Sequence, residues 1–364
     1  MKIKFFHNFI LIFLWVLLPL AHWSWGYDPN ELPKVLLFVC VINVSLGMWL
    51  IILYKRMFVK RSVVFWLILA TLVWNAVTSV LGDRPIISLA GLGYRYEGWL
   101  TLLALSELSY LVAVLKPKPK IVSKWVIVGS MATMAVMLVN GGGDWGGRWA
   151  GWMGNPNFAG GWLALNLVWL NGLWGLVATI LIGFSQSRSA ILGALTSVGI
   201  VYFLKTNKWV VSGAIAVATI VFLIVSSGWR WSKFDNRLIF WQKAVGAAVE
   251  RPLIGWGREN FEIALTSQLN DNDLELREIR VDRAHNEWLE ILVASGIPGV
   301  VLWSLLLGRV GWVLYKKKSE GYDRYLAVLG AFVVISSLNV LNINQYIWFY
   351  WIAGVAMAWE TEKV

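Results

Sequence analysis

The sequence predicts an all-α protein that crosses a membrane about 12 times and carries one long loop outside the membrane. Three observations support this fold class. Of the 364 residues, 58% are apolar and only 15% are charged. The mean hydropathy is +0.63, and a water-soluble domain of this size could not cover such an interior with polar surface. Apolar runs long enough for a helix to cross about 30 Å of hydrocarbon recur along the whole chain.

Twelve apolar segments can be assigned in order along the chain. The first follows Lys2 and Lys4 and resembles a signal peptide, but the sequence LAHWSW lacks a small-residue cleavage site, so we expect an uncleaved span. The sixth and seventh segments are short, and we expect them to form a hairpin. The twelve segments are residues 5–22, 34–54, 62–81, 98–115, 121–139, 158–171, 174–186, 189–204, 209–226, 286–314, 325–340 and 345–359.

The distribution of Lys and Arg predicts the orientation. If both termini are cytoplasmic and every segment crosses, the inner connections hold 18 basic residues and the short outer connections hold five. Merging the sixth and seventh segments would move the basic sequences KTNK and YKKKSEGYDR outside, against the positive-inside rule. We therefore expect a multi-pass protein of the cytoplasmic (inner) membrane, with a single membrane domain over residues 1–364.

One long loop, residues 227–284, joins the ninth and tenth segments and is expected on the outer side. It holds nine basic and nine acidic residues, so its charge gives no orientation signal. A proline and two glycines in RPLIGWGRENF end the helix that precedes them. We expect that helix to lie on the membrane surface, before a mobile or lid-like acidic segment over residues 269–284. The apolar residues of the helix recur on one side, at Leu238, Trp241, Val245 and Ala248.

Several classes of chemistry lack their motifs. The sequence has no GxxxxGKS phosphate loop and no GxSxG nucleophile elbow, which argues against cytosolic ATP-driven chemistry and serine hydrolysis. Cys40 is the one cysteine and the three histidines lie far apart, so neither a disulfide framework nor a zinc cluster is expected. The sequence NDND at residues 270–273 is interpreted as an acidic turn, so we expect no metal and no cofactor. The bilayer explains the net charge of +11 better than a nucleic-acid partner does.

Basic residues expected at the outer face are the candidates for a binding site. Arg188 lies between two apolar segments, where an arginine is costly unless it snorkels to the surface or pairs with an anion. Arg237 begins the loop helix one turn before Trp241, and an ordinary solvated charge is the alternative there. Two glycine-rich outer loops add Arg95 and Arg148, because such backbone can bring amide groups close to an anion.

His285 opens the tenth segment in the sequence AHNEW and is the candidate base. An imidazole, whose unperturbed pKa is about 6.5, can accept a proton at neutral pH. We expect Arg280 and Arg283 nearby to hold it in the neutral form. The alternative is a polar tip on an apolar interfacial helix. Asn286, the next residue, is a secondary candidate together with Trp241.

Four motifs, in their order along the chain, resemble those of the O-antigen ligase superfamily: GRWAGWMGNPNFAG, SQSRSAILGAL, RLIFWQKAVGAAVERPLIGWGRENF and AHNEWLEILVASGIPGVVLW. YDPNELPK and GLGYRYEG extend the resemblance over nearly the whole chain. The resemblance implies a type C glycosyltransferase fold and a donor glycan linked to undecaprenyl pyrophosphate. It also implies metal-independent catalysis outside the cytoplasmic membrane. The motif arginines and histidine of the family fall on Arg188, Arg237 and His285.

In this interpretation Arg188 and Arg237 hold the diphosphate, and His285 takes the proton of an acceptor hydroxyl on a glycan, lipid or protein. Direct attack would invert the anomeric centre, in surface polysaccharide or lipopolysaccharide assembly. The family includes ligases, repeat-unit polymerases and protein O-oligosaccharyltransferases, which the motifs do not separate. A transporter of a lipid-linked sugar and a structural partner in an envelope assembly are the other readings. The charged residues gather at the predicted outer rim, which favours a reaction at the membrane surface over transport of a sugar through the protein.

Overall fold

The computed structural model describes residues 2–24, 28–52, 62–91, 96–141, 145–205, 232–269, 281–317 and 321–362. Within these ranges the secondary structure is helical and contains no strand, which confirms the predicted all-α class. The helices are α1 (Lys2–Ile12, continued by a π-turn and a 3₁₀-turn to Leu20), α2 (Glu31–Ile52), α3 (Val63–Leu81), α4 (Pro85–Ala90), α5 (Trp99–Leu115), α6 (Pro119–Asn140), α7 (Pro156–Asn166), α8 (Gly172–Ser185), α9 (Arg188–Lys205), α11 (Ser232–Glu250), α12 (Phe261–Thr266), α14 (Glu287–Lys316), α15 (Asp323–Leu338) and α16 (Ile343–Glu362).

Every predicted apolar segment except the ninth coincides with a helix, and the ninth, residues 209–226, lies outside the described residues. Five helices are long and apolar enough to cross a membrane. They contain Glu31–Met48, Val63–Leu81, Pro119–Asn140, Arg188–Lys205 and Glu287–Lys316. The chain is therefore a polytopic helical membrane protein, and the number of 12 spans stays a prediction.

The helix α16 forms the centre of the core. Residues 346–358 are buried on every side of this helix, although a surface helix exposes one face. Tryptophans from two other parts of the chain fill space around it: the ring of Trp15 lies 4.3 Å from that of Trp348 in α16 and 5.6 Å from that of Trp162. Aromatic rings bury large areas, so this cluster ties α7, α16 and the π-turn after α1 together.

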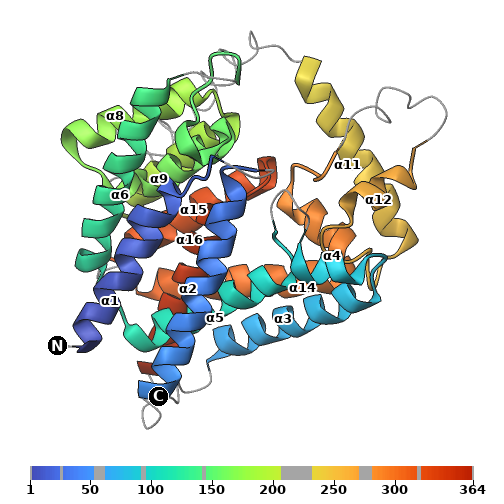
Figure 1. Ribbon diagram of the computed structural model, residues 1–364, viewed down its shortest axis with the longest axis horizontal. Helices are drawn as coiled ribbons and strands as arrows, with labels where there is room; N and C mark the ends of the chain where they lie inside the picture. The colour runs from blue at the N-terminus through green and yellow to red at the C-terminus, as the bar shows by residue number, and fades with distance from the viewer. Residues whose placement is uncertain are drawn as a thin grey trace.

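The loop helices form a layer beside this core, and Figure 1 shows α11 and α12 at the right of the view, next to α4 and α14. They have a small core of their own, which includes Phe240, Ala244 and Ala247 of α11. The predicted apolar side of α11 is therefore only partly correct. Leu238 and Val245 are 46% and 47% exposed, because the aromatic ring and the small alanines pack inward instead.

The helix α14 is broken in its middle, and the break holds the loop in place. Pro298 has no N–H, so the carbonyl of Ala294 lacks its helical donor. The N–H of Ile297 donates to the carbonyl of Pro252 (2.8 Å) instead of continuing the helix. The carbonyls of Val293 and Ala294 accept from the N–H groups of Trp256 (2.8 Å) and Gly257 (2.9 Å). The turn after α11 thus satisfies the backbone groups that the break exposes.

The Gly296→Ala variant should therefore unfold at a lower temperature than the wild type. Gly296 has φ +67°, and a Cβ built there would lie 2.3 Å from the carbonyl oxygen of Leu253. Such strain costs roughly 1–3 kcal/mol. Gly308→Ala on the same helix is the matched control, because a Cβ there has no neighbouring atom within 4 Å. Thermal unfolding of the purified variants, followed by tryptophan fluorescence, measures the difference. Equal midpoints for the two variants would contradict the role assigned to the break.

Two short helices were not predicted, α4 and α12. Each has six residues, too few for a hydrophobic period to show in the sequence. The boundaries of α4 do carry a signal, since it begins at Pro85 and ends before Gly91, which has φ +99°. The hydroxyl of Ser88 on α4 donates to the carbonyl of Arg258 (2.7 Å), so α4 also anchors the loop.

Candidate active site

The C-terminal end of α15 is where the elements that carry the predicted site residues meet. The carbonyl of Leu338 accepts a hydrogen bond from Nη1 of Arg237 (2.9 Å). The amide of Asn339 donates to Oγ of Ser189 (3.5 Å), the neighbour of Arg188. The indole of Trp288, three residues after His285, donates to Oγ of Ser337 (3.0 Å). The last carbonyls of a helix have no partner within it, so a guanidinium is a favourable neighbour there.

The position of Arg188 follows from the tight connection between α8 and α9, the seventh and eighth predicted segments. Gln186 has φ +49° and ends α8 in the left-handed conformation. The hydroxyl of Ser187 accepts from the N–H of Ala190 (3.4 Å), so it caps the start of α9. Arg188 is the first residue of that helix and is half-buried. Its charge therefore lies at the positive end of an 18-residue helix dipole.

Three arginines form one cluster of positive charge. Burial lowers the pKa of Arg237, and the charges of Arg188 and then Arg148 lower it further. Arginine stays protonated in proteins, so the lowered pKa measures mutual repulsion and desolvation rather than a loss of charge. A half-buried cluster of like charges is unfavourable by itself, and an anion between the guanidinium groups would relieve it.

Arg148 comes to the cluster from the glycine-rich loop before α7. Its Nε donates to the carbonyl of Ser185 (3.0 Å) and its Nη2 donates to Oδ1 of Asn157 (3.0 Å). Burial lowers its pKa as well. Arg148 thus lies beside Arg188 and Arg237. Arg95, the candidate from the other glycine-rich loop, lies outside the described residues.

The segment that carries His285 is held on both sides. The backbone of His285 has φ +53°, which is uncommon for a residue other than glycine. The carbonyl of Ala284 accepts from the indole N–H of Trp241 (2.9 Å). The backbone N–H of Ala284 donates to the carboxylate of Glu290 (2.9 Å). Oδ1 of Asn286 accepts from the N–H groups at the start of α14, as an N-cap does. The secondary candidates Trp241 and Asn286 therefore use these polar atoms to fix the backbone around His285.

Arg283, which was expected to act on His285, is paired with three carboxylates. It is 4% exposed, and its guanidinium forms ion pairs with Glu97 (3.1 Å), Glu290 (3.1 Å) and Glu259. Burial alone would lower the pKa of Arg283, but Glu259, Glu290 and Glu97 raise it well above its ordinary value. These carboxylates balance the charge of Arg283, so it is not a free cation beside the imidazole. Arg280, the other arginine that was expected near His285, lies outside the described residues.

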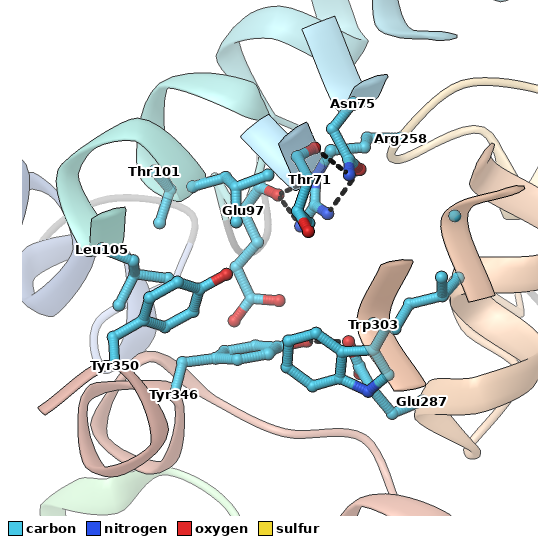
Figure 2. A pocket seen from close by; sticks show the side chains of 13 residues that line it. Thr71, Asn75, Glu97, Thr101, Leu105, Arg258, Glu287, Trp303, Tyr346 and Tyr350 are labelled. Carbon is cyan, nitrogen blue, oxygen red and sulfur yellow. Dashed lines mark hydrogen bonds between the residues drawn. The ribbon is translucent and has the colours of Figure 1, made fainter. Parts of the chain in front are cut away.

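A small cavity adjoins the ion pairs of Arg283, because Glu97 belongs to both, and Figure 2 shows the side chains that line it. Arg258 donates to the carbonyl of Glu97 (3.0 Å from Nη2) and to Oδ1 of Asn75 (3.3 Å). On the opposite wall the hydroxyl of Tyr346 donates to the carboxylate of Glu287 (2.6 Å). The cavity measures about 30 Å³, which is room for water and not for a sugar. It belongs to the framework that supports the loop.

This network was not predicted, although its charged members stand in or beside the four motifs, apart from Glu97 in GLGYRYEG. The signal available was a set of acids and arginines directly next to apolar segments, where an unpaired charge is costly. Their pairing is tertiary, since Arg283 and Glu97 are 186 residues apart. In the described ranges no group of three or more His, Cys, Asp or Glu side chains could hold a metal ion. The acidic turn at residues 270–273 lies outside those ranges.

Comparison with known proteins bears on the same part of the chain. Residues 173–304 match the family model described as O-antigen ligase. Arg188, Arg237 and His285 lie inside this match, and Arg148 precedes it. A search among curated proteins finds no match. The family is one of membrane enzymes with glycosyltransferase-like activity. Residues 173–304 are therefore similar to the O-antigen ligase family, which confirms the resemblance that the motifs in this part of the chain show to the O-antigen ligase superfamily.

Proposed function

We propose that this protein transfers glycan from an undecaprenyl-pyrophosphate-linked donor to an acceptor hydroxyl at the outer side of the cytoplasmic membrane, with both termini in the cytoplasm. The observation that carries the proposal is the cluster of Arg148, Arg188 and Arg237, whose charges act on one another at the end of α15. A diphosphate is the anion that a lipid-linked glycan donor brings to such a site.

The arginines would bind the diphosphate and stabilise its departure. When the bond between the anomeric carbon and the diphosphate oxygen breaks, the electron pair stays on that oxygen. A guanidinium group donates two parallel hydrogen bonds to phosphate oxygens and keeps its charge at any physiological pH. Because the groups are fixed before the reaction, they stabilise the developing charge without a reorganisation cost. No metal ion is needed in this step.

His285 would act as the general base for the acceptor. Its imidazole takes the proton of the acceptor hydroxyl, while the acceptor oxygen forms the new bond to the anomeric carbon from the face opposite the diphosphate. This direct displacement inverts the anomeric configuration. The hydrogen bonds from Trp241 and to Glu290 fix the backbone next to His285, so the base would have a defined position.

His285→Ala is expected to lower the rate of transfer by about 10²–10⁴-fold, the usual contribution of a general base. The assay uses the purified protein in membranes with a defined lipid-diphosphate sugar, and it measures glycan that leaves the lipid. Trp288→Phe is the matched control, since it removes only the hydrogen bond to Ser337 from the same helix turn. Full activity of His285→Ala would exclude it as the base.

The same assay separates the classes that the motifs leave open. A polymerase lengthens glycan that stays on the lipid, whereas a ligase moves the glycan to a new molecule. A lipid-linked sugar transporter would relocate the donor without breaking its glycosidic bond to diphosphate, and a structural partner would leave the donor unchanged. The charge cluster at helix ends favours the transferases, because a transport path places its polar groups near the middle of the bilayer.

A further inference from the structure

A second, larger cavity lies away from the arginine cluster. Its volume is about 600 Å³, within the range of small-molecule sites. It opens where α6 and α15 begin and α9 ends. Its side chains include Lys120, Ser123, Trp169, Lys205, Asp323 and Arg324.

Two packed helices place this cavity and the arginine cluster at opposite ends. The helices α9 and α15 run antiparallel, because Ser189 contacts Asn339 at one end and Lys205 pairs with Asp323 (3.0 Å) at the other. They have 18 and 16 residues, lengths of about 27 and 24 Å. Of the two, α9 is long and apolar enough to cross the hydrocarbon layer, which is about 30 Å thick. A crossing α9 places the two sites at opposite surfaces of the membrane.

The cavity is cationic. Of the described residues that line it, Lys120, Lys205 and Arg324 are basic and Asp323 is the one acid. Lys205 pairs with that acid, and its side chain is still 55% exposed. Arg324 lies over the ring of Trp169, 5.4 Å from its centroid, and Trp169 itself is buried. The first turns of α6 and α15 add the positive ends of two helix dipoles.

The surroundings indicate a lipid rather than a soluble anion. Tyr202 and Phe203, near the same end of α9, are 56% and 40% exposed, which offers apolar surface beside the cations. A phospholipid satisfies both features, since its phosphate accepts from lysine and arginine while its acyl chains lie along apolar side chains. Basic pockets between membrane helices on the cytoplasmic side bind anionic headgroups in this way.

We propose that this cavity binds the phosphate headgroup of an anionic membrane lipid, at the surface opposite the arginine cluster. Lys120 and Arg324 hold the phosphate, and Ser123 provides a hydroxyl beside them. The bound headgroup joins the start of α6 to the paired ends of α9 and α15. The site is separate from the proposed transfer reaction and does not depend on it.

The test compares lipids on the purified, delipidated full-length chain. Cardiolipin in mixed micelles should raise the unfolding temperature and remain bound in native mass spectrometry. The Lys120→Gln/Arg324→Gln variant should bind it roughly tenfold more weakly or worse, because each lost contact is charge-assisted. The matched control is Lys124→Gln/Lys316→Gln, which removes two cations that lie over Trp125 and Trp312 outside the cavity.

Three outcomes would overturn the proposal. Cardiolipin could leave the wild type unchanged, or phosphatidylcholine or inorganic phosphate could give the same stabilisation. Equal loss of binding in both double variants would mean that general surface charge, and not this cavity, attracts the lipid. An unfolding temperature without lipid equal to that of the wild type checks that the Lys120→Gln/Arg324→Gln variant is folded. Failure of the transfer assay in the wild type would concern the proposed function alone.

Discussion

The Arg237→Ala variant is expected to transfer glycan about 10²–10³-fold more slowly than the wild type, the effect of removing one donor from a preorganised anion site. Arg237 comes from the loop, and its charge acts on both Arg188 and Arg148, so its loss takes away the contribution of α11 to the cluster. The measurement is the initial rate with a saturating lipid-diphosphate sugar.

Two further variants show whether charge alone is enough. Arg237→Lys keeps the charge but loses the planar fork, so its rate should lie between those of the wild type and Arg237→Ala. Lys243→Ala is the control on the same helix, since Nζ of Lys243 donates to the carbonyl of Gln268 (2.7 Å) within the loop. A rate for Arg237→Ala that equals that of Lys243→Ala would remove Arg237 from the site.

Arg283→Met is expected to have the largest effect on stability, a loss of about 3–5 kcal/mol. The variant leaves Glu97, Glu259 and Glu290 together in a buried place without their cation. Arg251→Met is the control from the same loop. Its partner in the ion pair is Asp83 (2.6 Å), and the side chain of Arg251 is 38% exposed, so that loss should cost less than about 1 kcal/mol. Thermal or denaturant unfolding of both variants measures the difference.

The pH dependence of the stability of Arg283→Met tests the ion pairs independently. Without the guanidinium, burial and mutual repulsion favour the protonated carboxyl groups in the folded state. The folded variant then binds more protons than the unfolded chain, so its stability should rise as the pH falls from neutral toward the ordinary carboxyl range. The same recovery should be smaller in the wild type, because the guanidinium of Arg283 favours the charged carboxylates. A stability loss in Arg283→Met that is the same at every pH would contradict the ion-pair account.

Arg283 also shows how the framework and the site are connected. It lies two residues before His285, and one of its partners, Glu290, also accepts the N–H of Ala284. The carboxylate of Glu290 therefore fixes the guanidinium and the backbone beside His285 at once. In this account Arg283 is a positioning residue that acts on transfer through the segment of His285.

The helices were predictable because apolar composition alone sets them. A run such as residues 121–139 needs no tertiary information to be recognised, and it appears as α6 with boundaries within two residues. The separation of the sixth and seventh segments, which appear as α7 and α8, was predictable for a different reason, the distribution of Lys and Arg in distant connections. The inward face of α11 was not, because Phe240, Ala244 and Ala247 become buried only when the turn after α11 packs on the broken helix α14.

Some residues of the candidate site could likewise be predicted from the sequence, and others could not. Arg188 stood out since a charge beside an apolar segment requires an explanation, and Arg237 stood out as the start of the loop helix in a family motif. The structure brings them together with Arg148. The ion pairs of Arg283 could not be foreseen, because its partners come from separate positions along the chain and local sequence does not state which charges meet. The break in α14 was signalled by Pro298, but its hydrogen bonds to residues 252–257 were not.

The central claim is that the three arginines form the diphosphate site, and ligand binding without turnover tests it most directly. Undecaprenyl diphosphate should raise the unfolding temperature of the wild type and of His285→Ala alike, because the base takes no part in holding the leaving group. It should have little effect on Arg188→Gln or Arg237→Gln. Equal stabilisation of all four proteins would show that the lipid diphosphate binds elsewhere.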